Sequence, residues 1–186
     1  MNHRALSSFA LAAALLAGCS QDPPRTQSTG GLPPPQTVTS MDLQRLQGTW
    51  YEMGRIPAPG EKLHTAGIVI FAHSGDSLAM SYRWRDASID GATRDAGATI
   101  TTSPTHPSHL LLHNATGGLP RELWVLALAS DNSICVLATP DRKLAMILNR
   151  TPSINAASFG DVTRILESQA YPVDQLQITT QAPTAG

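Results

Sequence analysis

Cysteine is scarce in this sequence, and its basic residues form no cluster. Only Cys19 and Cys135 occur among the 186 residues. If Cys19 is modified, Cys135 has no disulfide partner within the chain, and its apolar surroundings favour a buried small side chain over a nucleophile. Lysine and arginine number 13 against 14 aspartates and glutamates, with no basic stripe among them. The sequence therefore predicts no nucleic-acid partner.

Recognisable catalytic motifs are also absent. The chain has no Gly-x-Ser-x-Gly, no His-Glu-x-x-His, no glycine-rich phosphate loop and no cysteine pair at metal-binding spacing. The nearest approach to a metal cluster is His106, His109 and His113. On a flat strand the last two would lie about 13 Å apart, too far to share one ion. The sequence thus predicts no enzyme, no cofactor and no metal site.

The N-terminus has the pattern of an export signal. Arg4 precedes an apolar run over residues 5–16 that is too short to span a bilayer comfortably, and Leu-Ala-Gly-Cys follows at residues 16–19. This pattern resembles a bacterial lipoprotein signal. The resemblance implies cleavage after residue 18, acylation of Cys19, and sorting to the outer membrane because Ser20 follows. The alternative is an ordinary secretory signal that happens to contain a cysteine.

Residues 19–40 are rich in proline, glycine, serine, threonine and glutamine. Such a segment has little to bury, so it is predicted to be an extended, disordered tether between the lipidated cysteine and a folded domain. That domain is expected over residues 41–181, with a short tail at residues 182–186. Its length suits a single domain.

Short β-rich segments separated by turns follow one another through the domain, as in a meander. The segments are residues 50–55, 67–73, 77–85, 96–102, 109–115, 122–129, 133–138 and 143–150. They predict an all-β fold, an eight-stranded antiparallel up-and-down β-barrel. Asp42 is expected to cap a helical turn at the barrel floor, residues 153–171 to form a C-terminal helix packed on the outside with Ser153 as its cap, and residues 176–178 to add a short strand.

One stretch can close the barrel at its floor. In Gly48-Thr49-Trp50 the glycine permits a tight entry and the indole buries a large apolar area. Far downstream, Arg150 ends an apolar strand. A guanidinium over the indole would stabilise the closed barrel by roughly 0.5–2 kcal/mol through a cation–π contact. Gly48, Trp50 and Arg150 are therefore predicted to be the barrel-closing residues.

Three segments in order resemble the lipocalins, and among them the bacterial outer-membrane lipoprotein type. They are Gly48-x-Trp50, the Thr-Pro-Asp-Arg at residues 139–142, and the Leu-Asn-Arg-Thr-Pro at residues 148–152. The resemblance implies a loop over about residues 57–66 that covers the open end, and a fatty acid or a lysophospholipid as ligand. The alternative is a chance Gly-x-Trp in an unrelated β domain.

Strand alternation indicates which side chains face the interior. The predicted cavity-lining residues are Leu78, Met80, Tyr82, Trp84, Leu123, Val125 and Met146. Such a lining suits an acyl chain. Arg55, Lys62, Arg83 and Arg85 are candidates to meet a headgroup, although each is more often a solvated surface charge. Glu52 is interpreted as structural, on the strand face opposite Arg55.

These patterns predict a membrane-anchored, periplasm-facing lipocalin at the cell outer membrane that binds, stores or transports a hydrophobic ligand without catalysis. A homodimer is compatible with the sequence. The main alternative is a lipoprotein adaptor whose barrel is a scaffold and whose loops, such as residues 86–95, bind another envelope protein. An envelope lipid hydrolase ranks third.

Overall fold

The computed structural model describes residues 31–182. The predicted signal, Cys19 and most of the predicted tether lie outside the described residues. The strands are β1 (Gly48–Ile56), β2 (His64–Ser74), β3 (Ser77–Asp86), β4 (Thr93–Thr102), β5 (His109–His113), β6 (Glu122–Leu128), β7 (Ile134–Ala138), β8 (Ala145–Asn149) and β9 (Gln177–Ile178). The helical elements are η1 (Leu43–Leu46), α1 (Ala156–Ser168) and η2 (Val173–Gln175). Within this part of the chain, no helix is both long and apolar enough to cross a membrane.

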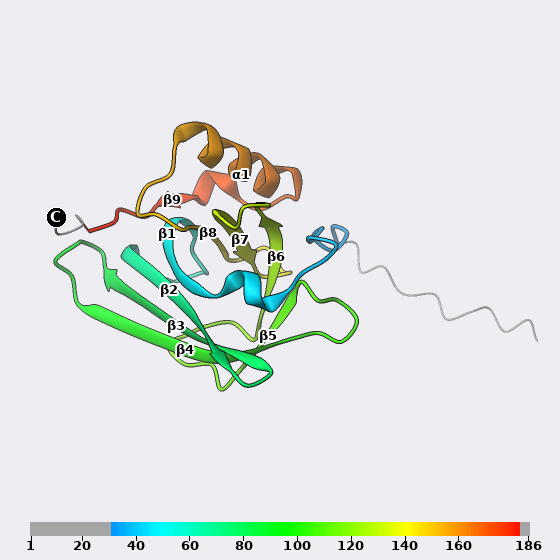
Figure 1. Cartoon of the computed structure of the whole chain (residues 1–186). Helices are drawn as coiled ribbons and strands as arrows, with labels where there is room; N and C mark the ends of the chain where they lie inside the picture. Colours follow the sequence, from blue (N-terminus) through cyan, green and yellow to red (C-terminus); the bar gives the residue numbers. More distant parts are fainter. Residues whose placement is uncertain (1–30, 183–186) are drawn as a thin grey trace, which may run out of the picture. The chain divides into compact units, whose positions relative to one another are not determined.

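Strands β1 to β8 form a closed antiparallel barrel (Figure 1). Each strand from β2 to β7 pairs with the next, β8 pairs with β1, and the first residues of β1 pair with β2. Further along β1, Gly54 and Arg55 pair with β9 instead. Closure removes the exposed strand edges that would otherwise invite aggregation. The predicted eight-stranded barrel with a C-terminal helix is confirmed.

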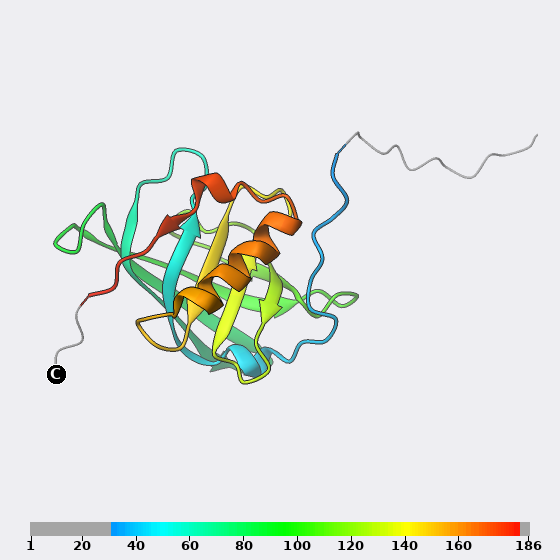
Figure 2. The same ribbon diagram turned by 90° about the horizontal axis from the view of Figure 1, so that it is seen from above.

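The barrel has two distinct ends; in Figure 2 η1 marks one at the bottom and the connection 57–63 marks the other at the top. The closed end carries η1 and the connections 75–76, 103–108 and 129–133. The open end carries the connections 57–63, 87–92, 114–121 and 139–144. Asp42 caps η1 as predicted, because its side chain accepts a hydrogen bond from the backbone of Gln44 at 2.9 Å.

Helix α1 lies across the outer face of β6, β7 and β8 (Figure 2). Val162 and Leu166 are its buried residues. They belong to a second hydrophobic cluster outside the barrel, with Met53, Ile56, Leu126, Val136, Ala138, Ala145, Ile147 and Tyr171. The helix starts later than predicted because Asn155, and not Ser153, accepts the capping hydrogen bond, from Ser158 at 2.8 Å.

A β-bulge on β1 changes which residues face the interior. The register with β8 shifts between Glu52 and Gly54, so Met53 is an extra residue that joins the outer cluster. Strict alternation predicts Arg55 on the face opposite Glu52, and that prediction is wrong. One additional residue reverses the alternation, so Arg55 contacts Glu52 inside the barrel.

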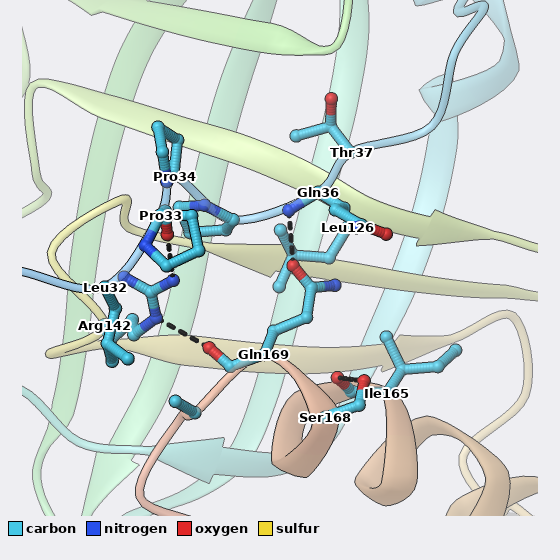
Figure 3. Close-up of a pocket in the computed structure, with 12 residues that line it drawn as sticks. Leu32, Pro33, Pro34, Gln36, Thr37, Leu126, Arg142, Ile165, Ser168 and Gln169 are labelled. Atoms are coloured by element: carbon cyan, nitrogen blue, oxygen red, sulfur yellow. Dashed lines mark hydrogen bonds between the residues drawn. The ribbon is translucent and has the colours of Figure 1, made fainter.

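The last part of the predicted tether is ordered against the barrel. Residues 33–38, here called the strap, include the buried Pro35. Val38 donates a backbone hydrogen bond to the Val125 carbonyl at 3.0 Å, and the backbone of Gln36 donates to the Gln169 side chain at 2.5 Å (Figure 3). Disorder up to residue 40 was the expectation, and the structure differs. Proline restricts φ already in the unfolded chain, so little entropy is lost when the strap docks.

Candidate functional site

The barrel interior contains the seven side chains named above as its predicted lining. Alternation along β3 directs Leu78, Met80, Tyr82 and Trp84 inward. They belong to one buried cluster with Leu123, Val125 and Met146, and with further side chains from β2, β4, β5 and β7. The most exposed of the seven predicted residues is Trp84, at 8%. Their common inward orientation agrees with the sequence interpretation.

The interior is packed rather than hollow, which corrects the expectation of a wide cavity. A pocket at the inner face of the open end has a volume of only about 10 Å³ and is bordered by Tyr82, Trp84, Leu144 and Met146. This volume holds about one water molecule. The filling comes from large side chains: Trp50, Phe71 and Tyr82 are at most 1% exposed. Phe71, which the strand pattern did not single out, occupies space that was expected to be empty.

The closed end is sealed by the predicted arginine and indole. The Arg150 guanidinium carbon lies 3.7 Å from the centre of the Trp50 ring. Its nitrogens donate to the backbone carbonyls of Asn132 at 3.2 Å, Thr49 at 3.1 Å and Arg45 at 3.1 Å. Trp50 itself donates through Nε1 to the Leu46 carbonyl at 2.6 Å. The guanidinium therefore ties η1 to β1 and to the connection 129–133 between β6 and β7.

Gly48 permits this closed arrangement for two physical reasons. Its φ is +94°, a conformation that residues with a Cβ rarely adopt. A Cβ built there would also lie 3.1 Å from Arg150 Nη1. Glycine at this position therefore provides both the backbone turn and the space for the guanidinium.

The open end contains a buried ionic network beneath the connection 57–63, here called the lid. Arg55 donates to Glu61 of the lid at 2.6 and 3.0 Å and to Glu52 at 3.2 Å. Glu52 also accepts from Tyr82 Oη and Thr179 Oγ1, both at 2.9 Å. Glu52 is fully buried and Arg55 is 4% exposed. The two carboxylates balance a guanidinium that has almost no contact with water.

Burial and Arg55 together set the pKa values in this network. Burial raises the pKa of Glu52 above its ordinary value, although Arg55, Thr179 and Tyr82 oppose the change. Burial also acts to raise the pKa of Glu61, but the hydrogen bonds and charge of Arg55 overcome it and hold the pKa low. Burial, followed by the charge of Arg55, lowers the pKa of His64 to about 4. His64 is therefore neutral at pH 7.

A neutral His64 connects the network to the aromatic side chains of β3. Its Nδ1 lies 2.8 Å from Tyr82 Oη, and because Tyr82 donates to Glu52, this nitrogen carries the proton. The His64 ring also stacks on Trp84, with 4.6 Å between ring centres. Trp84 Nε1 is buried with no hydrogen-bond partner within 3.5 Å in the described residues. The pKa of the nearby Asp86 carboxylate is lowered, first by its hydrogen bond from Arg94 and to a smaller extent by Trp84.

A shallow groove lies above this network at the mouth of the barrel. It has a volume of about 430 Å³, and its border joins the lid to the end of β3, the start of β4 and the connection 114–121 through Lys62, Asp86, Arg94, Gly117 and Gly118. Lys62 is the one predicted headgroup candidate that borders it. Arg83 points to the exterior and pairs with Asp95 at 2.7 Å, and Arg85 donates to the Gly91 carbonyl at 3.3 Å.

The histidines considered for metal binding are not brought together. His106 stacks on His109 with 4.6 Å between ring centres, and His109 stacks on Trp124 at 3.8 Å. His113 points elsewhere and bonds to Thr101 Oγ1 at 2.9 Å. In residues 31–182 no group of three or more histidine, cysteine, aspartate or glutamate side chains is placed to hold a metal ion. Cys135 is fully buried, and burial raises the pKa of its thiol to about 12.

Comparisons with known proteins agree with this architecture. The lipocalin-like domain family matches residues 41–181. Temperature-induced lipocalin-1 of Arabidopsis thaliana is 21% identical over 160 residues, covering 80% of this chain and 84% of that protein. A lipocalin of Acanthamoeba polyphaga mimivirus is 24% identical over 144 residues, covering 74% of this chain and 83% of that protein.

Two solved structures illustrate the similarity in fold. Insecticyanin from the tobacco hornworm Manduca sexta superposes with a TM-score of 0.63 and 16% identity, covering 83% of this chain and 88% of that one. Lobster apocrustacyanin A1 superposes with a TM-score of 0.58 and 12% identity, covering 81% and 92%. At such identities the structures show a common fold and nothing finer.

Proposed function

Because this chain belongs to the lipocalin-like family, we propose that it binds, stores or transports a hydrophobic ligand at the bacterial outer membrane. The proposed ligand is a fatty acid or a lysophospholipid. The proposed location is the periplasmic face, where acylated Cys19 anchors the protein as a lipoprotein. Lipocalins are carriers of small ligands rather than enzymes, and no catalytic role is assigned to any residue.

The observation that supports this function best is the continuous apolar lining of the barrel. The inward side chains of β3, β6 and β8 offer dispersion contacts and few hydrogen bonds. An acyl chain that leaves water for such surroundings gains about 0.8 kcal/mol per methylene, offset by its immobilisation. The cationic Lys62 at the mouth can meet a carboxylate or phosphate headgroup.

Since the interior is packed, ligand entry requires side chains to move. Met80 and Met146 are the residues best suited to this, because methionine is unbranched and adapts to irregular spaces. Met146 borders the small pocket beneath the lid, together with Leu119 and Leu144. We expect an acyl chain to enter there and to displace these side chains.

A packed interior also favours a second candidate, the lipoprotein adaptor. In that function the barrel is a scaffold that needs no cavity, and an exposed loop recognises another envelope protein. Residues 87–92 form a connection at the open end, and Ala87 and Asp90 in it are exposed. A ligand-binding measurement separates the two candidates.

The experiment compares two methionine variants of the chain lacking residues 1–19. Met146→Ala enlarges the interior, whereas Met53→Ala removes an equally buried methionine from the outer cluster. Displacement of a fluorescent fatty acid should be measurable for the unmodified protein, several-fold tighter for Met146→Ala and unchanged for Met53→Ala. Native mass spectrometry would identify a lipid that copurifies. No binding by any of the three proteins would contradict the carrier and favour the adaptor.

A further inference from the structure

The strap runs along the outer wall of the barrel from the open end to the closed end. In Figure 2 it extends upward from η1, at the bottom, to the level of the lid, at the top. At the open end Arg142, in the connection 139–144, donates through Nη2 to the Pro33 carbonyl at 2.6 Å (Figure 3). The same guanidinium donates through Nε to the Gln169 carbonyl at 2.6 Å. Arg142 therefore joins the strap to the end of α1.

Separate elements of the barrel hold the rest of the strap. Ser108 Oγ donates to Thr37 Oγ1 at 2.8 Å. Val38 bonds to β6 at the Val125 carbonyl, while the Val125 amide bonds to the Ser108 carbonyl at 2.9 Å. The Val38 side chain packs against the interior cluster. The strap thus continues the pairing of β6 at the point where β5 begins, and it belongs to the barrel wall.

This course changes where the N-terminal chain leaves the domain. Without the strap, the chain that precedes η1 would leave from the closed end. With the strap docked, the chain reaches Leu32 beside Arg142, at the open end. Docking therefore moves the attachment point from one end of the barrel to the other.

We propose that the docked strap turns the open end of the barrel toward a lipid surface. This inference rests on the proposed lipid anchor at Cys19. The twelve residues 20–31 separate that cysteine from Leu32. Fully extended they span at most about 40 Å, so the mouth stays within that reach of the bilayer. A mouth that faces the bilayer receives lipids directly from it.

The side chains at the open end agree with this orientation. In the described part of the chain four large hydrophobic residues are exposed, and two of them, Leu32 at 60% and Leu63 at 41%, lie at the open end. The other two lie elsewhere, Ile70 on β2 and Ile178 on β9. Lys62 adjoins Leu63 and forms no ion pair among residues 31–182. A lysine beside an exposed leucine suits the interface of an anionic membrane.

The test measures which end of the barrel approaches the bilayer. The lipidated full chain is reconstituted in vesicles that contain phosphatidylglycerol and a lipid with a nitroxide headgroup. Ser88→Cys places a fluorophore at the open end and Ser74→Cys places one near the closed end, both at exposed serines. Cys135 is fully buried and does not compete for the label. We expect quenching at position 88 to be at least threefold that at position 74.

Releasing the strap should abolish this difference. Arg142→Ala combined with Gln169→Ala removes the contacts to Pro33 and Gln36, and Arg121→Ala removes a comparable charge from the same end. Amide hydrogen exchange at Val38 should accelerate at least tenfold in the double variant. Exchange at Ile147 in β8 should stay unchanged, which would show that the barrel remains folded. The quenching ratio should then fall toward one, and Arg121→Ala should leave it unchanged.

The outcomes separate this inference from the proposed function. Protein that floats with the vesicles but shows equal or reversed quenching overturns the orientation and leaves the lipid anchor intact. A quenching ratio that stays unchanged after release of the strap likewise shows that the strap does not orient the barrel, and leaves the lipid anchor intact. Protein that does not float with the vesicles overturns the anchor and, with it, the orientation.

Discussion

Each end of the barrel places an arginine against an aromatic ring, but the two ends neutralise its charge differently. At the closed end Arg150 lies over Trp50 and donates to three backbone carbonyls, without a carboxylate partner. At the open end Arg55 lies 5.7 Å from the Tyr82 ring centre and bonds to two carboxylates. Neutral acceptors suffice where the guanidinium is partly exposed. Full burial requires counter-charges.

This difference has a consequence for movement of the lid. Glu61 belongs to the lid, and its two hydrogen bonds to Arg55 hold the lid shut. Opening the lid would leave Arg55 with Glu52 as its one counter-charge. At the closed end Arg150 also bonds to a connection, at the Asn132 carbonyl of residues 129–133, but this acceptor is neutral, so no pair of opposite charges would be separated there. Opening of the lid would therefore separate opposite charges, and a displacement at the closed end would not.

The largest effect is expected at the open end. Arg55→Ala would leave Glu52 buried without its cationic partner and should lower the free energy of unfolding by about 3–5 kcal/mol. Urea denaturation followed by tryptophan fluorescence measures this. The double variant Glu52→Leu with Arg55→Met removes both charges and should recover much of the loss. Equal destabilisation by the single and the double variant would show that packing, and not charge, stabilises this end.

A smaller effect is expected for the arginine at the closed end. Arg150→Ala should lower the free energy of unfolding by roughly 1–3 kcal/mol, because it removes a cation–π contact and hydrogen bonds that water can partly replace. Arg150→Lys keeps the charge but cannot donate to three carbonyls at once, so its free energy of unfolding should lie between those of the unmodified protein and Arg150→Ala. A loss for Arg150→Ala larger than that for Arg55→Ala would reverse the comparison of the two ends.

Gly48→Ala should have an effect of about 1 kcal/mol or slightly more. The methyl group would strain a backbone with φ of +94° and press on Arg150 Nη1. Combining Gly48→Ala with Arg150→Ala separates the two causes in a double-mutant cycle. If the effects are simply additive, backbone strain alone accounts for the requirement for glycine.

The most specific effect is a pH dependence at the open end. The pKa of His64 is about 4 in the folded protein and near 6.5 when unfolded, so the unfolded state binds more protons between these values. The contribution of His64 to stability is complete above about pH 6.5 and is lost as the pH falls toward 4. Burial, followed by the charge of Arg55, lowers the pKa of His64, while the carboxylates of Glu61 and Asp86 oppose the change.

Melting temperatures measured from pH 7 to pH 4 test the His64 contribution. Glu61, whose pKa is lowered, adds a loss on acidification, and Glu52, whose pKa is raised, acts in the opposite direction. The comparison is therefore made against His64→Gln, which should show a shallower decline in that interval. Identical pH profiles for the two proteins would contradict the assigned role of His64.

Patterns within single elements were enough to predict much of the fold. Period-two alternation on β3 indicates its inward face, Asp42 marks the start of η1, and the order of strands and turns indicates closure into eight strands. The meeting of Trp50 with Arg150 also followed from the residues, because a plug in a barrel needs a partner on the adjoining strand. These features depend on local spacing and on the apolar character of whole strands.

Other features could not be read from spacing. The bulge at Met53 depends on how β1 pairs with β8. Because of it, Arg55 lies in the ionic network and not on the face that alternation predicts. The apolar lining identified the inward residues but not the space left between them, because that space depends on side chains from many strands. Phe71 and Tyr82 fill what alternation alone suggested was a cavity.

The sequence by itself determined the closed barrel and its plug, since these follow from strand periodicity and from two complementary side chains. The tertiary structure alone decided that the interior is packed, that Glu61 of the lid meets Arg55, and that the strap lies along the wall. The physical reason is that each of these depends on groups far apart in the chain, whose distances are set only when the strands pair and close. A hydrogen bond such as that from Val38 to Val125 cannot be predicted until the position of β6 relative to the strap is known.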